Sequence, residues 1–202
     1  GGSTYSWFRY QVHRAQENAL AVHEEAAEDF ARRFGRRHGL IEAFLCDDAE
    51  YVLVMSNAFA TKGKEAVLRW RAQGVRAGLL RLRVLRPFPA RAIAAGLAGR
   101  RAVAVIDQNL APGLGGITHA EVAAALYDEP ARPALLSHVG GLGGKEISAA
   151  EFDAVLEDLR RAAGGERRPG PRLLFTRADA QRTETLLRRG RELRWHPEYM
   201  RV

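Results

Sequence analysis

Two glycine-rich segments contain the residue types best suited to binding a phosphate group or a neighbouring chain. The first, residues 107–116, offers Asn109, Pro112, Gly113, Gly115 and Gly116, and the second, residues 140–146, offers Gly143, Gly144 and Lys145. Backbone N–H groups of such a loop bind phosphate when the loop leads into a helix N-terminus. The first segment, however, is neither a G-x-G-x-x-G fingerprint in a first βα unit nor a P-loop, because no Gly-Lys-Ser/Thr sequence follows.

Each glycine-rich segment also has a structural explanation. In the first segment we favour glycines that supply positive φ angles and let another chain approach the backbone closely. The second segment has two explanations that fit its residues equally well. It is either a loop that wraps a ligand, with Lys145 supplying charge, or a plain turn before a capped helix. Neither explanation makes the segments catalytic.

The remaining reactive residue types form no recognisable catalytic set. The six histidines, at positions 13, 23, 38, 119, 138 and 196, lack the spacing of metal ligands. His119 and His138 lie near loop ends, where we favour a structural role over donation to a substrate. Ser56 and Ser137 have no G-x-S-x-G sequence around them, so hydrolase chemistry is unsupported. Cys46 is the single cysteine, too few for a disulfide, a zinc site or an iron–sulfur cluster, and we expect it to be buried.

Length and composition indicate a globular protein with a true core. The 202 residues are 47% hydrophobic and 27% charged. No apolar run approaches the roughly 18–20 residues that cross a bilayer. Residues 1–4 look like a linker and lack the features of a signal peptide. We therefore expect a cytoplasmic protein with no membrane partner.

The net charge of +7 is concentrated near the C-terminus. Residues 164–202 hold ten arginines and five acidic residues, a balance of +5. A basic extension of this kind binds either RNA phosphates or an acidic partner, or forms a solvated or subunit-contacting surface. We favour the surface, so nucleic acid is not expected as a partner.

The order of elements predicts an α/β fold. Apolar residues from Val12 to Phe34 recur at spacings of three and four, which predicts a long helix within residues 1–46 that packs on the domain. Four apolar runs, at 50–55, 77–85, 102–106 and 134–139, alternate with helical patterns at 61–73, 90–97, 118–127 and 148–163. A possible fifth strand, 173–175, precedes a basic helix at 179–193, and the aromatic segment 195–199 could contact a neighbour. Within residues 47–163, this alternation predicts three layers: an open, mostly parallel sheet of about five strands with helices on both faces.

Ligands and partners of such sheets meet the loops at the carboxyl ends of the strands. Ser56 and Asn57 follow the first strand directly, and both glycine-rich segments follow later strands. The three segments are therefore expected at one edge of the sheet.

Several short segments, in order, resemble one enzyme family. They are AEYVLV at 49–54, KEAV at 64–67, GLLRLR at 78–83, RPFP at 86–89, VAVIDQN at 103–109 and GLGGKEI at 141–147, with RFGR at 33–36 ahead of them. Together they resemble the transketolase C-terminal-type domain of the α subunits of pyruvate and other 2-oxoacid:ferredoxin oxidoreductases (pyruvate synthases). The resemblance covers about residues 7–162, and residues 164–202 lie outside it.

The resemblance implies an enzyme that converts a 2-oxoacid and CoA to an acyl-CoA, with electrons passing to ferredoxin. It implies thiamine diphosphate, Mg²⁺ and iron–sulfur clusters in the complete enzyme, held by thiamine-binding β, γ and ferredoxin-like δ subunits or other domains. The isolated chain is then expected to be non-catalytic and to serve assembly, with a possible place beside CoA. The alternative is a stand-alone scaffold whose arginine-rich extension binds RNA or an acidic protein.

The resemblance also suggests a set of site residues. The expected surface toward CoA or neighbouring subunits comprises Ser56, Asn57, Asn109, Pro112, Gly113, Gly115, Gly116, Gly143, Gly144 and Lys145. One departure affects it: relatives usually have Gly-Ser at the turn where this sequence has Ser56-Asn57. Because Asn tolerates positive φ better than most residues, we expect the turn to be kept with altered contacts.

Overall fold

The centre of the structure is a six-stranded, mostly parallel sheet in the order β1-β3-β2-β4-β5-β6. The computed structural model describes residues 1–166 and 170–194. The strands are β1 (Ile41–Phe44), β2 (Tyr51–Ser56), β3 (Ala77–Leu82), β4 (Ala102–Asp107), β5 (Ala134–Val139) and β6 (Arg172–Leu173). All neighbouring pairs are parallel except β1 and β3. The predicted fold class is confirmed, with one more strand than the five expected.

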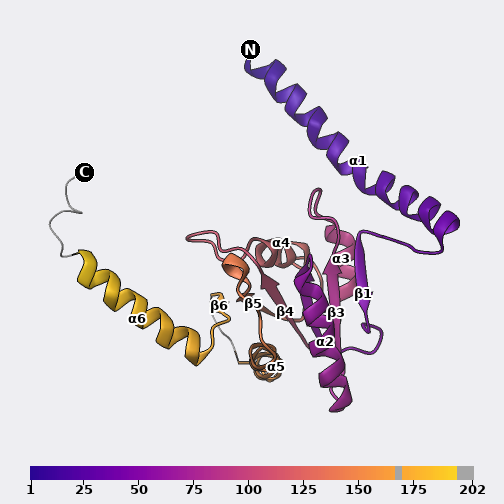
Figure 1. The fold of residues 1–202 in the computed structure, drawn as a ribbon. Helices are drawn as coiled ribbons and strands as arrows, with labels where there is room; N and C mark the ends of the chain where they lie inside the picture. Colours follow the sequence, from indigo (N-terminus) through magenta and orange to yellow (C-terminus); the bar gives the residue numbers. More distant parts are fainter. Residues whose placement is uncertain (167–169, 195–202) are drawn as a thin grey trace.

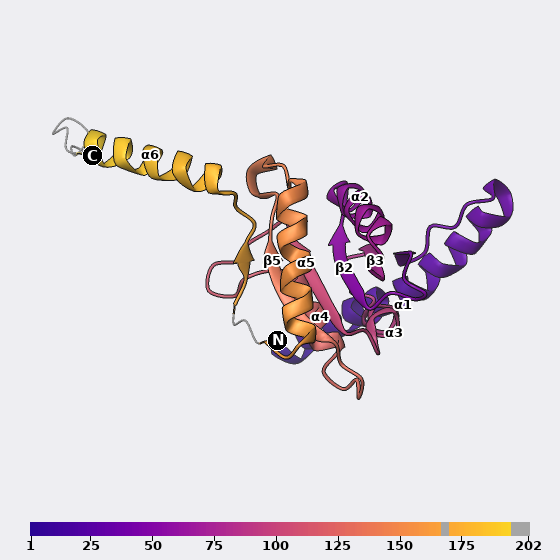
Figure 2. The same cartoon turned by 90° about the horizontal axis from the view of Figure 1, so that it is seen from below.

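Helices cover both faces of the sheet and divide the core in two (Figures 1 and 2). On one face, α2 (Phe59–Ala72) and α5 (Ala149–Ala163) cover Leu53, Leu79 and Ala104. On the other, α3 (Ala90–Leu97) and α4 (Ile117–Ala125) cover strand residues that include Val54 and Leu80. Successive strand residues face opposite sides, and parallel strands covered on both sides are apolar throughout. All six residues of β4 are accordingly buried.

The predicted helix start at Ser148 is present. The Ser148 Oγ accepts a hydrogen bond from the Glu151 N–H, and the Glu151 carboxylate accepts one from the Ser148 N–H at 2.8 Å. This capping box begins α5 shortly after the second glycine-rich loop, which contains the short 3₁₀ turn η1 (Leu142–Gly144).

Two helices extend away from the sheet (Figure 1). The first, α1 (Gly2–Phe34), includes most of the segment interpreted as a linker, and the second is α6 (Arg177–Arg194). The expectation that the N-terminal helix packs on the domain is wrong for most of its length, because Ala27 is its one buried residue. Its C-terminal part is held to residues 37–40, where the Glu24 Oε1 accepts the Leu40 N–H at 3.1 Å. An apolar stripe specifies that a helix has a partner surface but not which surface that is.

The sheet also extends past the predicted boundaries of the domain. β1 begins at Ile41, ahead of residue 47, and β6 lies beyond residue 163. The end of the chain that was predicted to offer aromatic contacts, residues 195–199, lies outside the described residues. Among the residues described, no helix combines the length and the apolar character needed to span a membrane.

Candidate functional site

The loops after β2, β4 and β5 meet at one edge of the sheet, as predicted. These strands are parallel, and β4 lies between β2 and β5. The connection from β2 leads to β3 on one side, and the connection from β3 returns past β2 to β4 on the other. Sheets of this kind bind ligands where the connections diverge in this way, at the carboxyl ends of the strands. For this chain, that position lies between the loops after β2 and β4.

Side chains from the loops after β2 and β4 pack against the loop after β5. A Cβ atom at Gly141 would lie 3.0 Å from Cε1 of Phe59 and 3.1 Å from Nε2 of Gln108. Gly141 also has a φ angle of 80°, which residues with a Cβ rarely adopt. Phe59 follows β2, Gln108 follows β4 and Gly141 follows β5, so the three loops are locked together by contact.

The first glycine-rich loop caps α4 from within the chain. The Asp107 carboxylate accepts the N–H groups of Thr118 at 2.9 Å and His119 at 3.0 Å, and the Asn109 Oδ1 accepts that of Ile117 at 3.2 Å. A Cβ at Gly116 would lie 2.1 Å from Oδ2 of Asp107, so the carboxylate needs glycine there. The N–H groups that would hold a phosphate are therefore used, and the Asp107 charge repels anions. This geometry supports the structural explanation over phosphate binding.

The charge of Lys145 in the second loop is also used within the chain. Its Nζ lies 2.7 Å from Oε1 of Glu151 and 3.2 Å from Oδ2 of Asp179, joining the start of α5 to the start of α6. Burial lowers the pKa of Lys145, but the hydrogen bonds with these two carboxylates outweigh it and raise the pKa above its ordinary value. Gly143 and Gly144 have φ angles of 62° and 81° and open space beside them.

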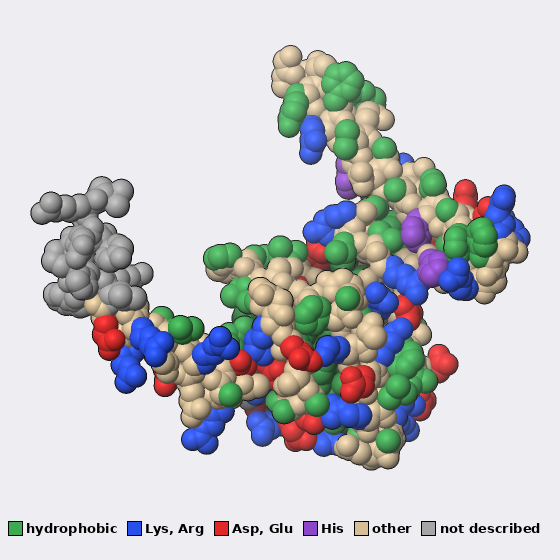
Figure 3. Space-filling model, in the orientation of Figure 1, with side chains coloured by type: hydrophobic (Ala, Val, Ile, Leu, Met, Phe, Trp, Pro, Cys, Tyr) green, Lys and Arg blue, Asp and Glu red, His purple; other side chains and the backbone are tan. Residues whose placement is uncertain are grey.

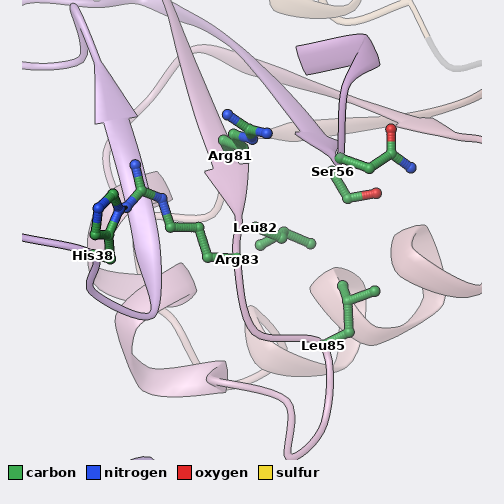
Figure 4. Close-up of a pocket in the computed structure, with 7 residues that line it drawn as sticks. His38, Ser56, Arg81, Leu82, Arg83 and Leu85 are labelled. Carbon is green, nitrogen blue, oxygen red and sulfur yellow. Dashed lines mark hydrogen bonds between the residues drawn. The ribbon is translucent and has the colours of Figure 1, made fainter. Parts of the chain in front are cut away.

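A cavity of about 490 Å³ opens on the β2–β3 side of the same edge (Figure 4). We call it the basic pocket; it is lined by His38, Ser56, Asn57, Arg81, Leu82, Arg83 and Leu85. Ser56 pairs with Leu82 across the two parallel strands, which places the end of β2 beside the end of β3. Ser56 and Asn57 are thus the two predicted site residues that line this pocket.

Asn57 adopts the positive φ expected from the sequence, and the altered contacts of the turn stay a prediction. Asn57 has a φ of 49°, and its Oδ1 accepts the Phe59 N–H at 3.2 Å. This side-chain bond within the turn uses the Asn57 oxygen, and Asn57 lines the pocket.

Positive charge exceeds negative charge around the basic pocket. Glu42 of β1 is the shared partner of three cations: it contacts Arg83 at 2.7 Å and Arg81 at 3.7 Å, and it hydrogen-bonds Lys64. Burial raises the pKa of Glu42, but the bonds with Arg83 and Lys64 outweigh burial and lower the pKa to about 2. Glu42 is therefore ionised at neutral pH, and one negative charge faces three positive ones.

The remaining candidates from the sequence have structural surroundings. His138 is fully buried, and its Nε2 lies 3.0 Å from Oδ2 of Asp158, which also contacts Arg172. Burial lowers the pKa of His119. Cys46 is buried, and burial raises the pKa of its thiol. Across residues 1–166 and 170–194, no group of three or more His, Cys, Asp or Glu side chains could hold a metal ion.

Comparison with known proteins identifies the family. Residues 49–152, from the start of β2 into α5, match the family described as pyruvate:ferredoxin oxidoreductase core domain II. The chain belongs to this family. The region matched contains the switch between β2 and β4, both glycine-rich loops and most of the basic pocket.

Two named relatives are similar to this chain over a longer stretch than the family match. The pyruvate synthase subunit PorA of Methanothermobacter thermautotrophicus is 34% identical over 163 residues, which are 81% of this chain and 41% of that protein. The ketoisovalerate oxidoreductase subunit VorA of Pyrococcus abyssi is 34% identical over 158 residues, 78% of this chain and 40% of that protein. The chain thus spans about two fifths of the length of these relatives. A solved 2-oxoglutarate:ferredoxin oxidoreductase from Magnetococcus marinus is 15% identical, with a TM-score of 0.45 over 67% of this chain and 21% of that one.

Proposed function

We propose that this chain is a component of a 2-oxoacid:ferredoxin oxidoreductase. The complete enzyme converts a 2-oxoacid such as pyruvate, with CoA, to an acyl-CoA and CO₂ while two electrons pass to ferredoxin. The observation that carries the proposal is the family match over residues 49–152, which includes β2 to β5 and all three loops at their carboxyl ends. The chain spans about two fifths of its relatives. We propose that the complete enzyme also contains thiamine-binding, γ and ferredoxin-like parts.

The residues of this chain do not fit the redox cofactors of such an enzyme. Iron–sulfur clusters are held by sets of cysteine thiolates, and Cys46 is a single buried cysteine. Thiamine diphosphate is held through Mg²⁺, which prefers carboxylate and other oxygen ligands in near-octahedral arrangement. The described part of the chain contains no acidic cluster of that kind. We therefore assign the chain a non-catalytic part, with residues 47–163 as its core and the two helical extensions as contacts.

Exposed apolar side chains support a role in assembly. In the first glycine-rich loop, 48% of Leu110 and 64% of Leu114 are exposed, and Leu142 of the second loop is also exposed. Figure 3 shows hydrophobic side chains gathered where this first loop projects from the domain. Contiguous exposed apolar surface indicates a protein interface. We assign this leucine surface, residues Leu110, Leu114 and Leu142, to contact with another part of the oxidoreductase.

The N-terminal half of α1 offers a second surface for assembly. Tyr5, Trp7, Phe8 and Tyr10 are each more than half exposed. Aromatic side chains are enriched at protein interfaces and rarely stand free in water on a single helix. We assign these aromatic residues to another part of the same enzyme.

The test is purification of the tagged chain from its native cells, with mass spectrometry of the proteins that accompany it. We expect a thiamine-binding subunit and a cysteine-rich, ferredoxin-like subunit. Leu114→Asp should release them, because a charge buried at an interface is left without a partner. Leu68→Asp is the matched control, since Leu68 is an exposed leucine of α2, away from the loops.

Recovery of RNA or unrelated proteins in place of the two subunits would contradict the proposal and favour the scaffold role of the basic extension. A complex that survives Leu114→Asp as well as it survives Leu68→Asp would keep the enzyme assignment and remove only the leucine surface from the interface.

A further inference from the structure

We infer that the basic pocket is a binding site for the phosphate group of a small phosphorylated ligand. Its volume, about 490 Å³, lies within the range of small-molecule sites, about 300–1,000 Å³. It lies at the carboxyl ends of two parallel strands, where sheets of this kind bind ligands. Phe59 and Gln108, from the loops after β2 and β4, pack against Gly141, whereas the cavity lies on the β2–β3 side of the edge.

Arg81 is the residue best placed to bind the ligand. Its nearest acidic partner is Glu42, at 3.7 Å, which is beyond hydrogen-bond distance. Within the described chain, its guanidinium therefore retains its five N–H donors, in a fork that matches two phosphate oxygens. Arg83 is more firmly held, because it donates to Glu42 at 2.7 Å and contacts Nδ1 of His38 at 2.7 Å. Arg83 thus provides a fixed charge, and Arg81 provides the free donors.

Two neutral groups on the β2 side of the same pocket offer further donors. Within residues 1–166 and 170–194, the Ser56 hydroxyl makes no hydrogen bond, and the Asn57 amide nitrogen donates none. Both residues line the same cavity as Arg81, and Figure 4 shows Ser56 at the end of its strand, apart from the Arg81 side chain. Donors of this kind fix the orientation of an anion once the arginines have attracted it.

The shape and charge of the pocket favour a phosphate over a lone carboxylate. Glu42 already provides one carboxylate to Arg81, Arg83 and Lys64, and two positive charges remain unbalanced. Leu85, which is 45% exposed, adds an apolar side chain that suits the organic part of a phosphate ester. A small ligand with a doubly charged phosphate and an apolar portion fits both properties.

CoA is the first ligand to test, a choice that rests on the proposed function. The full chain would be titrated by calorimetry at low salt with CoA, dephospho-CoA, pantetheine and inorganic phosphate. We expect CoA to bind, pantetheine to fail, and Arg81→Gln to weaken binding about 10- to 100-fold, the usual effect of losing a charge-assisted hydrogen bond. Arg76→Gln is the matched control, because Arg76 forms an exposed ion pair with Glu50 at the other end of the strands.

The outcomes separate the possible sources of the phosphate. If dephospho-CoA and inorganic phosphate compete with CoA through Arg81, the site recognises phosphate in general. If only CoA binds, the site reads the phosphate on its ribose. Binding by pantetheine alone, binding equal in Arg81→Gln and Arg76→Gln, or absence of binding by every phosphate compound would overturn the inference. Circular dichroism of both variants excludes misfolding as the cause.

The two experiments can distinguish failure of the phosphate-site inference from failure of the proposed function. Recovery of the oxidoreductase subunits does not depend on phosphate binding by this chain. A chain that binds phosphate through Arg81 but purifies without those subunits would keep the site and refute the enzyme assignment.

Discussion

Replacing Gly141 by alanine should destabilise the domain, because it inserts a methyl group where three loops meet. The new Cβ would lie 3.0 Å from the Phe59 ring and 3.1 Å from the Gln108 amide, at a φ of 80°. A left-handed backbone costs a residue with a Cβ about 1–2 kcal/mol, and overpacking costs about 1–3 kcal/mol. Alanine restricts the unfolded chain, which offsets about 0.4–1 kcal/mol. The expected net loss is about 1–5 kcal/mol in the free energy of unfolding.

Gly143→Ala is the matched control for this experiment. Gly143 also has a positive φ, 62°, but no atom lies within 4 Å of the position that its new methyl group would take. It shares the backbone strain and lacks the contacts, so it should be more stable than Gly141→Ala by the contact cost alone, about 1–3 kcal/mol. Urea unfolding followed by circular dichroism and by fluorescence of the buried Trp70 measures both values. Equal losses in the two variants would refute the packing of Phe59 and Gln108 against Gly141.

Two further predictions concern buried ionisable groups. Burial raises the pKa of Asp158, but hydrogen bonds with His138 and Arg172 outweigh burial and lower the pKa to about 2. Its contribution, on the order of 2 kcal/mol, is therefore complete above its unfolded pKa and lost as pH falls from about 4 to about 2. Stability measured against pH should fall less steeply there in Asp158→Asn, and an unchanged slope would contradict this. Because burial raises the pKa of Cys46, a thiol reagent at pH 8 should modify it slowly in the native protein and rapidly in urea, whereas equal rates would show an accessible thiol.

The core of the fold was predictable because its strands are buried on both faces. Runs such as residues 102–106 are continuously apolar, and helical patterns separate them, which is the signature of parallel βαβ units. β1 was missed because it has only four residues and carries Glu42, whose charge is tolerated through its cationic partners. The N-terminal helix was predicted but misplaced, because its apolar stripe carries no information about its partner.

The candidate site was predictable in position but not in composition. Ser56 and Asn57 could be placed at a carboxyl end because they follow a strand directly. Arg81 and His38 lie far from them in the sequence, and only the pairing of β2 with β3 and the path of residues 35–40 bring them to the same pocket. The alternation of arginine and leucine at 81–83 was the available signal, since arginine at the end of a parallel strand is positioned for a ligand.

The carboxyl edge of the sheet has two halves with opposite chemistry. On the β4–β5 side, Asp107 caps α4 with a buried negative charge, and the loop beyond it exposes leucines. On the β2–β3 side, Arg81 and Arg83 line an open cavity with a positive excess. An anion is repelled from the β4–β5 side and attracted to the β2–β3 side. An apolar protein surface suits the β4–β5 side, whereas on the β2–β3 side it would leave the arginines unpaired. Under the two proposals, one edge contacts a protein and a phosphorylated ligand at once, without competition between them.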